Sequence, residues 1–366
     1  MTKTMNLNKN LYSYLCPPGS GVFTVNTAKE HKDVLQKKLY GESNDITKSW
    51  QESLKGLDDQ RGALMLGICS DCGGGIQRGA NWGPLYLRNQ IIQAHESTKY
   101  FDIGDVRVIP HLLHDKYLNE QTLRNCKEAL YEDKESELPV SPLSISKKCC
   151  DDIYENIKDV GIFSIGGDHS VSYPIVKSWL EHKNRNNIKA AIIHFDAHTD
   201  LLVTRLGIDL CFGSWLTHVL PDLSDPKLCY QFGIRSTGKD RNHWENQFGI
   251  HQYWTREVKE IGPLKLIDKV IKELKDNGVQ EVYISFDIDA LDSKFAAATG
   301  TPEPEGLEPH ECVIMIDRLA EELKVTGGDV VEIAPRIGDE QNSKRTLECG
   351  AIIASRIIEA INSAYS

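Results

Sequence analysis

Seven short apolar runs, most of them bounded by glycine or aspartate, recur along the chain from Ala63 onward. They cover residues 63–68, 106–109, 160–167, 189–196, 228–235, 281–289 and 330–335. The runs are β-branched or aromatic in character and apolar on both faces, which is typical of strands buried on two sides. Between them lie segments predicted to be helical, such as 171–183 and 263–278; in the second, apolar residues recur with the helical period and Gly278 stands just past the end.

The alternation of strands and helices predicts an α/β protein with a single doubly wound, mainly parallel sheet and helices on both faces. Residues 1–60 differ from the rest: a Pro/Gly stretch at 17–22 is followed by polar, helical sequence. No internal repeat or domain linker is evident. We therefore expect an N-terminal extension over 1–60 and one catalytic domain over 61–366.

Composition narrows the class of protein. The chain has 366 residues, of which 40% are hydrophobic and 26% charged, and its net charge of -11 argues against a nucleic-acid or membrane-surface partner. The N-terminus lacks the apolar core of a signal peptide, and no run reaches the ~18–20 apolar residues that span a bilayer. The ten cysteines are mostly scattered, which fits reduced thiols. These features predict a soluble cytoplasmic protein.

Ionisable residues gather where the apolar runs stop. Ligands of open α/β sheets bind outside the carboxyl ends of the strands, and here those ends read 166-GGDHS-170, 196-DAHTD-200, 285-SFDIDALD-292 and 331-VEIAP-335. Strand side chains alternate between faces, so Asp196, His198 and Asp200 would project together, as would Asp287 and Asp289. Taken singly, such aspartates could be helix caps and His169 a buried histidine with its own partners.

Taken together, these residues predict a binuclear metal site. With His169 they supply four carboxylates and two imidazoles, and leaving such carboxylates buried and unpaired would cost several kcal/mol each. Two divalent cations would balance four carboxylates. An oxygen-rich set with some imidazole suits Mn²⁺, with Ni²⁺, Fe²⁺ or Co²⁺ as alternatives. Two such ions ~3.5–4 Å apart can activate a shared water at neutral pH.

At these motifs the sequence resembles the ureohydrolase family, which includes arginase, agmatinase and formimidoylglutamase. The resemblance rests on GGDHS, DAHTD and SFDIDALD, and continues in 71-DCGGGIQRGANWGPLYLR-88, 101-FDIGDV-106, 231-QFGIRS-236, 299-TGTPEP-304 and 331-VEIAP-335. It covers residues 62 to 362. It implies the family's three-layer α/β/α fold, a manganese-dependent amidinohydrolase activity and a homo-trimer or homo-hexamer.

The resemblance also implies roles for single residues. One ion would be held by His169, Asp196, Asp200 and Asp287, and the other by Asp196, His198, Asp287 and Asp289. A hydroxide between them would attack the guanidinium or amidinium carbon, with Asp200 steadying it and relaying its proton. Glu332 would pair with the cationic nitrogens of the substrate and orient the carbon.

Three positions depart from the family pattern. Phe212, in 211-CFGSW-215, stands where relatives commonly carry a proton-shuttling histidine, and His218 is a candidate replacement. Leu202 stands where arginases have an Asn and formimidoylglutamases an Arg, although Arg205 is near enough to compensate. Glu305 replaces a usual glycine, where it would either favour a cationic substrate tail or be a solvated loop residue. With Glu332, residues 202, 212 and 305 form the predicted substrate pocket.

These departures favour a guanidino substrate without an α-amino acid head: agmatine, a guanidino acid or guanidine itself, with release of urea. Two alternatives stay open. One is a formimidoylglutamase-type hydrolase that acts on a formimino compound and releases formamide. The other is a family member that binds metal without turnover, since the shuttle histidine is missing.

Overall fold

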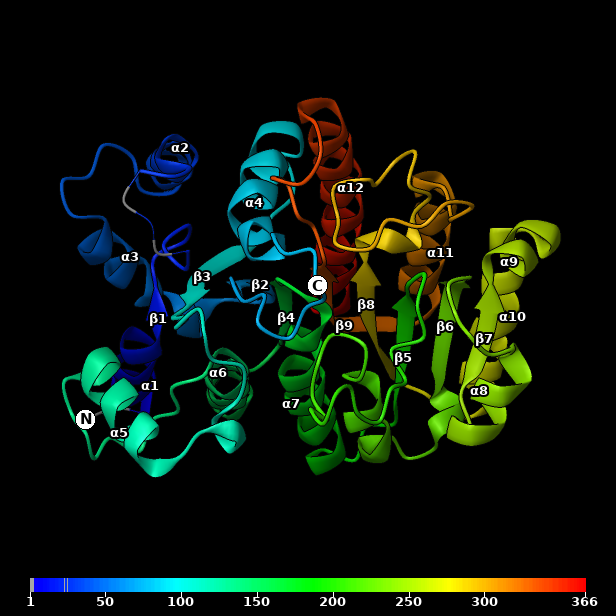
Figure 1. The fold of residues 1–366 in the computed structure, drawn as a ribbon, viewed down its shortest axis with the longest axis horizontal. Coiled ribbons are helices and arrows are strands. Elements are labelled where there is room, and N and C mark those ends of the chain that lie inside the picture. The colour runs from blue at the N-terminus through cyan, green and yellow to red at the C-terminus, as the bar shows by residue number, and fades with distance from the viewer. Residues whose placement is uncertain (1–2, 23, 25) are drawn as a thin grey trace.

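A single sheet runs through the middle of the molecule. The computed structural model describes residues 3–22, 24 and 26–366. In them the chain forms a nine-stranded sheet with the order β1-β3-β2-β4-β9-β8-β5-β6-β7, in which only β1 runs antiparallel to its neighbour (Figure 1). The strands are β1 (Leu15–Cys16), β2 (Gly62–Gly67), β3 (Phe101–Val106), β4 (Val160–Ile165), β5 (Ala190–Phe195), β6 (Cys229–Ile234), β7 (His251–Trp254), β8 (Glu281–Asp287) and β9 (Lys324–Val331).

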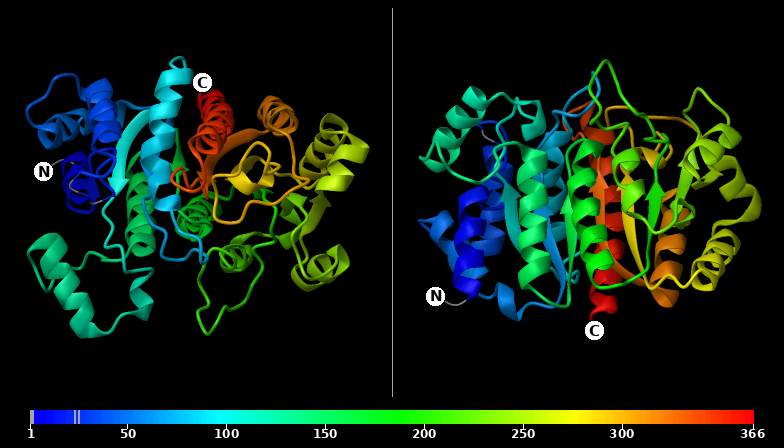
Figure 2. Two further views of the ribbon diagram at one scale, coloured as in Figure 1. Left: turned by 45° about the horizontal axis from the view of Figure 1, so that its top comes forward. Right: turned by 90° about the horizontal axis from the view of Figure 1, so that it is seen from below.

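Helices cover both faces of the sheet, so the predicted fold class is confirmed as a three-layer α/β/α arrangement. On one face α12 packs on β9, β2 and β4 between α4 and α11, and on the other α6 packs between α1 and α7 (Figure 2). The helices are α1 (Lys3–Tyr14), α2 (Lys29–Tyr40), α3 (Ile46–Leu54), α4 (Gly83–Ala94), α5 (Glu120–Tyr131), α6 (Pro142–Asn156), α7 (Ser172–Arg185), α8 (Arg241–Phe248), α9 (Thr255–Ile261), α10 (Pro263–Asp276), α11 (Pro309–Glu322) and α12 (Glu340–Ala364).

Two of the seven expected strands are misplaced. The run 106–109 overlaps β3 only at Val106, because the strand occupies 101–106 and its polar Asp102 and Asp105 hide its apolar pattern. The run 330–335 covers only the last two residues of β9, whose earlier part holds two glycines. The antiparallel β1 and the edge strand β7 were not expected, since both are short.

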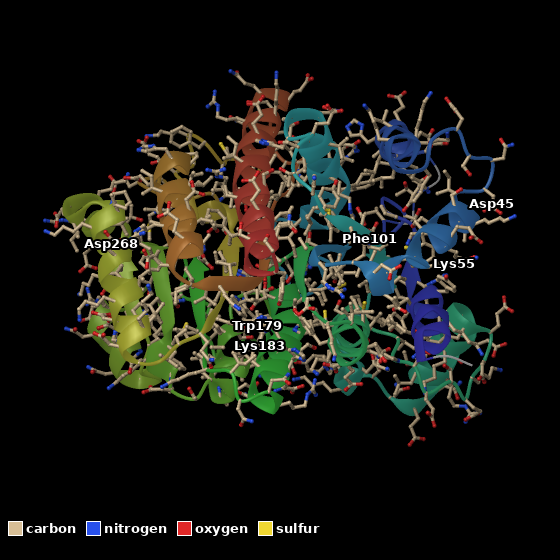
Figure 3. All side chains as sticks on the ribbon, turned by 180° about the vertical axis from the view of Figure 1, so that it is seen from behind. Asp45, Lys55, Phe101, Trp179, Lys183 and Asp268 are labelled. Atoms are coloured by element: carbon tan, nitrogen blue, oxygen red, sulfur yellow. The ribbon has the colours of Figure 1, made fainter. Side chains whose placement is uncertain are left out.

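Helix α7 shows how the layers are locked together. Trp179 and Lys183, both labelled in Figure 3, lie on its inner side against the sheet. The Trp179 indole donates to Thr326 Oγ1 at 3.1 Å, and Lys183 Nζ lies 2.8 Å from Glu281 Oε2. These polar groups satisfy each other at the amino ends of β8 and β9, while the carboxyl ends are left for the site.

Residues 1–60 are attached to the sheet at several points. Strand β1 pairs with β3, and the Tyr14 hydroxyl donates to Asp152 Oδ2 on α6 at 2.6 Å. The backbone N–H groups of Gly19 and Gly21 donate to Asp105 Oδ2 at 2.8 and 3.0 Å. The division into an extension and a catalytic domain stays a prediction, and residues 1–2, 23 and 25 of that extension lie outside the described residues. Within the described chain, none of the helices is long and apolar enough to cross a membrane.

Candidate metal centre

Six ionisable side chains meet at the carboxyl edge of four adjacent strands. His169 follows β4, Asp287 ends β8, and Asp196, which follows β5, is separated from Asp287 by a single strand-to-strand step. We refer to His169, Asp196, His198, Asp200, Asp287 and Asp289 as the carboxylate cluster. All of its members are buried except His198, which is about a quarter exposed. The sheet topology therefore brings together the six residues that the strand ends pointed to.

One half of the cluster is centred on His169. Its Nδ1 lies 3.2 Å from Asp196 Oδ2, 3.1 Å from Asp200 Oδ2 and 3.1 Å from Asp287 Oδ2. Among the described residues, neither His169 Nδ1 nor Asp200 Oδ2 has a hydrogen-bond partner. One ring nitrogen cannot satisfy three carboxylates, so this half has more acceptors than donors.

The tautomer of His169 strengthens this conclusion. The Ser285 hydroxyl donates to Asp329 Oδ1 at 2.8 Å, so its oxygen accepts from His169 Nε2 at 3.1 Å. The Tyr283 hydroxyl donates to the other oxygen of Asp329 at 2.8 Å and holds that carboxylate in place. With its proton on Nε2, His169 presents the Nδ1 lone pair to the three carboxylates, as a metal-ligating histidine does.

The other half of the cluster is centred on His198. Its Nδ1 lies 3.1 Å from Asp289 Oδ2 and 3.5 Å from Asp196 Oδ1. Asp289 Oδ2 also accepts from the Thr301 hydroxyl at 2.9 Å, and Glu303 Oε1 lies 3.4 Å from His198 Nε2. Asp196 faces both halves, which is what a residue shared between two ions must do.

The electrostatics of the cluster fit a divalent cation in each half. Burial, followed by the charges of Asp289 and Asp196, raises the pKa of Asp287 well above its usual range. Burial and the charge of Asp196 likewise raise the pKa of Asp200. Without cations, these carboxyl groups would have to stay protonated or carry unfavourable buried charge at neutral pH. A set of oxygen-rich donors with two imidazoles matches Mn²⁺ or Ni²⁺.

Glu332 lies beside the cluster and is held in an unusual backbone conformation. It follows β9, and its Oε1 accepts from the backbone N–H of His169 at 2.9 Å. Both Glu332 and Asp200 have positive φ angles, 62° and 52°, which non-glycine residues rarely adopt. Such strain concentrates at functional sites, where the surrounding structure enforces it. Burial and the charge of Asp287 raise the pKa of Glu332 well above its usual range, because a buried carboxyl group beside another carboxylate is hard to ionise. A cationic substrate group beside Glu332 would have the opposite effect on this pKa.

Phe212 and Leu202 lie on the loop after β5, which in Figure 2 rises in green beyond the carboxyl edge of the sheet. Phe212 N–H donates to Gly73 O at 3.0 Å, and a Cβ placed on Gly75 would lie 3.5 Å from the Phe212 ring. The Leu202 N–H donates to Gly213 O at 2.9 Å. Phe212 therefore bridges this loop and the glycine-rich loop at 71–80.

Two predicted residues are not brought to the cluster. His218 Nε2 donates to Asp209 O at 2.8 Å and its ring packs edge-on against Tyr173, so its contacts lie elsewhere. Glu305 is exposed and lines a separate cavity of about 480 Å³ with Arg235, which follows β6, and with Arg256 and other residues of α9. Its positive φ of 59° explains why a glycine would suit that position.

Sequence reasoning missed a histidine that supports the cluster. His194 lies in β5, two residues before Asp196 on the same face, and its Nε2 lies 2.9 Å from Asp196 Oδ2. Strand alternation could have indicated it. Ser285 and Thr301 stand inside the motifs 285–292 and 299–304 but were given no role there. Asp329 was missed, since an aspartate inside a strand carries no distinctive pattern.

Comparisons with known proteins agree with this geometry. The sequence profile of the arginase family matches residues 61–359. Mitochondrial guanidino acid hydrolase of Homo sapiens is 29% identical over 301 residues, which cover 78% of this chain and 74% of the human protein. Agmatinase of Bacillus anthracis is 30% identical over 278 residues, covering 74% of this chain and 83% of the relative. The solved structure of proclavaminate amidino hydrolase from Streptomyces clavuligerus superposes with a TM-score of 0.62 at 23% identity, over 82% of this chain and 93% of that one.

Proposed function

This chain belongs to the arginase family, and we propose that it hydrolyses a C–N bond of a guanidino compound and releases urea. The observation that carries the proposal is the pair of unpartnered buried atoms, His169 Nδ1 and Asp200 Oδ2, that face each other at 3.1 Å. A cation between them would satisfy both. The guanidino acid hydrolase and agmatinase relatives act, by their names, on guanidino compounds.

Two divalent cations, Mn²⁺ in the first place and Ni²⁺ as the alternative, would be held by the carboxylate cluster. His169, Asp196, Asp200 and Asp287 would hold one, and Asp196, His198, Asp287 and Asp289 the other. When bound, such a pair lowers the pKa of a shared water from ~16 towards neutrality and so supplies a nucleophile at pH 7.

The chain's own residues would bind the substrate and move the proton. Glu332 pairs with the guanidinium nitrogens, which presents the central carbon to the cluster. Asp200, whose pKa burial raises, accepts the proton released as water adds and passes it to the departing nitrogen. The products balance as urea and a free amine.

The tail of the substrate would be a carboxylate, bound by Arg205. The exposed Arg205 guanidinium lies over the Phe212 ring, 5.0 Å from its centroid, and it forms no ion pair among the described residues. A cation held on an aromatic face without a counter-ion suits an anionic ligand. Glu305, the other candidate for tail recognition, lines the separate cavity together with Arg235 and Arg256. We therefore favour guanidino acids over agmatine.

Metal-stripped protein reconstituted with Mn²⁺ or, separately, Ni²⁺ tests the reaction. The enzyme is incubated with 4-guanidinobutyrate, agmatine, methylguanidine, arginine and formiminoglutamate, and urea and formamide are quantified together. We expect urea, with the highest kcat/KM for 4-guanidinobutyrate. No urea from any guanidino compound, with both ions bound, would overturn the proposal.

Arg205→Ala tests the tail, with Arg205→Lys as the conservative variant. Loss of a charge-assisted contact predicts about a tenfold higher KM for 4-guanidinobutyrate or more, little change for methylguanidine, and partial rescue by lysine. An unchanged KM for the acid would remove Arg205 from the site without affecting the proposed reaction.

Arg205 also supports a second candidate function, hydrolysis of a formimino compound. A formimino acid carries carboxylates that the same guanidinium could bind, and formamide as the sole product would select that hydrolase. Metal binding without release of urea or formamide would indicate a family member that binds metal without turnover.

Assembly into a homo-trimer or homo-hexamer and a cytoplasmic location stay predictions. Analytical sedimentation tests the oligomeric state.

A further inference from the structure

A chain of buried side-chain hydrogen bonds crosses three strands and ends on the cluster. On β7, Trp254 Nε1 donates to Gln252 Oε1 at 3.1 Å, and Gln252 Nε2 donates to Gln231 Oε1 on β6 at 2.7 Å. Gln231 Nε2 donates to His194 Nδ1 on β5 at 2.9 Å, and His194 Nε2 lies 2.9 Å from Asp196 Oδ2. Gln252, Gln231 and His194 are fully buried.

The chemistry of its two anchors fixes the direction of every bond in this chain. An indole can only donate, so Gln252 must turn its oxygen to Trp254 and its amide N–H to Gln231. A backbone carbonyl can only accept, and Gln231 Nε2 also donates to Thr199 O at 2.7 Å. Both anchors require Gln231 to present N–H to His194 Nδ1, which therefore accepts.

The outcome for Asp196 is a carboxylate fixed at both oxygens. With Nδ1 accepting, His194 carries its proton on Nε2 and donates it to Asp196 Oδ2. Oδ1 accepts from the backbone N–H of His198 at 2.6 Å. Each oxygen has one donor from the chain and keeps lone pairs that face the two halves of the cluster. His194 itself has no nitrogen left over for an ion.

We propose that Gln231 and Gln252 are positioning residues of the metal centre: by imposing the Nε2–H tautomer on His194 they hold Asp196 in the orientation that two cations can share. The inference rests on the metal-binding part of the proposed function and does not depend on which substrate is hydrolysed. Partners of this kind typically change metal affinity about 10- to 100-fold when they are removed.

Gln231→Glu is the sharpest test, because glutamate has the shape of glutamine but can only accept. His194 Nδ1 must then carry a proton, and the imposed tautomer is lost. Gln231→Met gives a second, uncharged variant that removes the donor and keeps the volume. Gln252→Glu breaks the chain one step further out, where Thr199 still orients Gln231. Gln36→Glu is the matched control, because Gln36 is also buried but donates to Pro18 and Ser20 in the N-terminal segment.

Two readouts separate positioning from mere packing. Calorimetric titration of the metal-free proteins with Mn²⁺ gives affinities, and imidazole ¹⁵N spectra give the His194 tautomer. We expect the affinity to fall about 10- to 100-fold for both Gln231 variants, less for Gln252→Glu, and not for Gln36→Glu. The His194 spectrum of Gln231→Glu should show a proton on Nδ1, whereas Gln231→Met should keep the Nε2–H pattern, since Asp196 still accepts from Nε2.

Wild-type affinity for both ions in Gln231→Glu and Gln231→Met, or a His194 without a proton on Nδ1 in Gln231→Glu, would overturn the inference. Neither readout uses substrate. A wild type that binds both ions and releases no urea would therefore contradict the proposed function while this inference stands.

Discussion

Two buried clusters of charge lie in this molecule, and they differ in whether their hydrogen bonds are complete. In the first, Arg88 donates to both oxygens of Asp102 at 2.8 and 3.0 Å and to Asp105 Oδ1 at 2.5 Å. Asp105 Oδ2 accepts from the backbone N–H groups of Gly19 and Gly21. Every carboxylate oxygen in this network has a donor from the chain.

The carboxylate cluster, in contrast, leaves acceptors facing one another. Asp200 Oδ2 and His169 Nδ1 have no partner in the described chain, although both are buried. Unsatisfied buried acceptors are costly and rare in folded proteins. We infer that the complete network serves the fold, where it ties residues 19–21 to the sheet, and that the incomplete one serves binding.

The largest expected effect comes from Asp196→Asn, which tests the incomplete cluster at the residue shared by both halves. An amide loses the negative charge and offers one oxygen, so both ions should be lost and urea release should fall at least about a thousandfold, as removal of metal-ion catalysis implies. Metal content by elemental analysis and urea release check this outcome. Retention of two ions by the variant would contradict the shared role of Asp196.

Arg88→Met tests the complete network and should affect stability instead of activity. Arg88 is fully buried, and its loss leaves two buried carboxylates without their main partner, which should cost about 3 to 5 kcal/mol of unfolding free energy. Urea denaturation measures the loss, and activity per folded molecule should be unchanged. A stable variant with impaired metal binding would reverse the roles assigned to the two clusters.

Without bound cations, the stability of the protein should depend on pH. In the metal-free protein the pKa values of Asp287, Asp200 and Glu332 are raised, because these groups are buried and lie beside other carboxylates. The folded state then binds more protons than the unfolded chain, whose carboxyl pKa values are ~4. Stability should therefore fall as the pH rises above about 4, by about 1.4 kcal/mol per pH unit for each extra proton held.

Asp196 behaves differently, because the neighbouring histidines, His169 first and then His194, overcome the effect of burial and lower its pKa. Asp196 is ionised in both the folded and the unfolded state above about pH 4, so it adds nothing to the slope in that range. Bound cations replace the protons, so the slope should disappear when Mn²⁺ is present. Urea denaturation at several pH values with EDTA and with Mn²⁺ checks this, and equal slopes in both would contradict it.

The comparison of the clusters also shows what sequence could predict. The cluster residues follow buried strands directly, so strand periodicity and the rule that ligands bind at carboxyl ends predict that they lie together at one edge of the sheet, as they do in the structure. Their roles as metal ligands stay predictions. His218 ends a short 3₁₀ helix, Leu216–His218, and Glu305 stands in a loop, and in both places sequence distance from the motif gives no direction for the side chain. The structure places the first against Tyr173 and the second beside Arg235.

The supporting contacts were beyond sequence reasoning for a different reason. Gln231 and Gln252 reach His194 only because β6 pairs with β5 and β7 in a particular register, with His194 opposite Gln231 and Gln231 opposite Gln252. A shift of one residue would turn each glutamine to the other face. Register depends on the packing of the whole sheet, which no local pattern reveals.

The smallest expected effect is that of Phe212→His, which adds a proton carrier to the wall of the incomplete cluster. The Phe212 ring is only partly buried, and even a Cβ added to Gly75 would lie 3.5 Å from it, so the smaller imidazole should be tolerated. If proton transfer limits the wild type, kcat should rise, up to about tenfold, well below the ~10²–10⁴ of a fully positioned acid or base. The same change removes the aromatic face beneath Arg205, worth about 0.5–1 kcal/mol, so KM for a guanidino acid should rise a few-fold. Opposite movements of kcat and KM would assign proton transfer and tail recognition to the same wall, whereas a collapse of kcat with bound metals retained would mean that Phe212 shapes the pocket for the substrate.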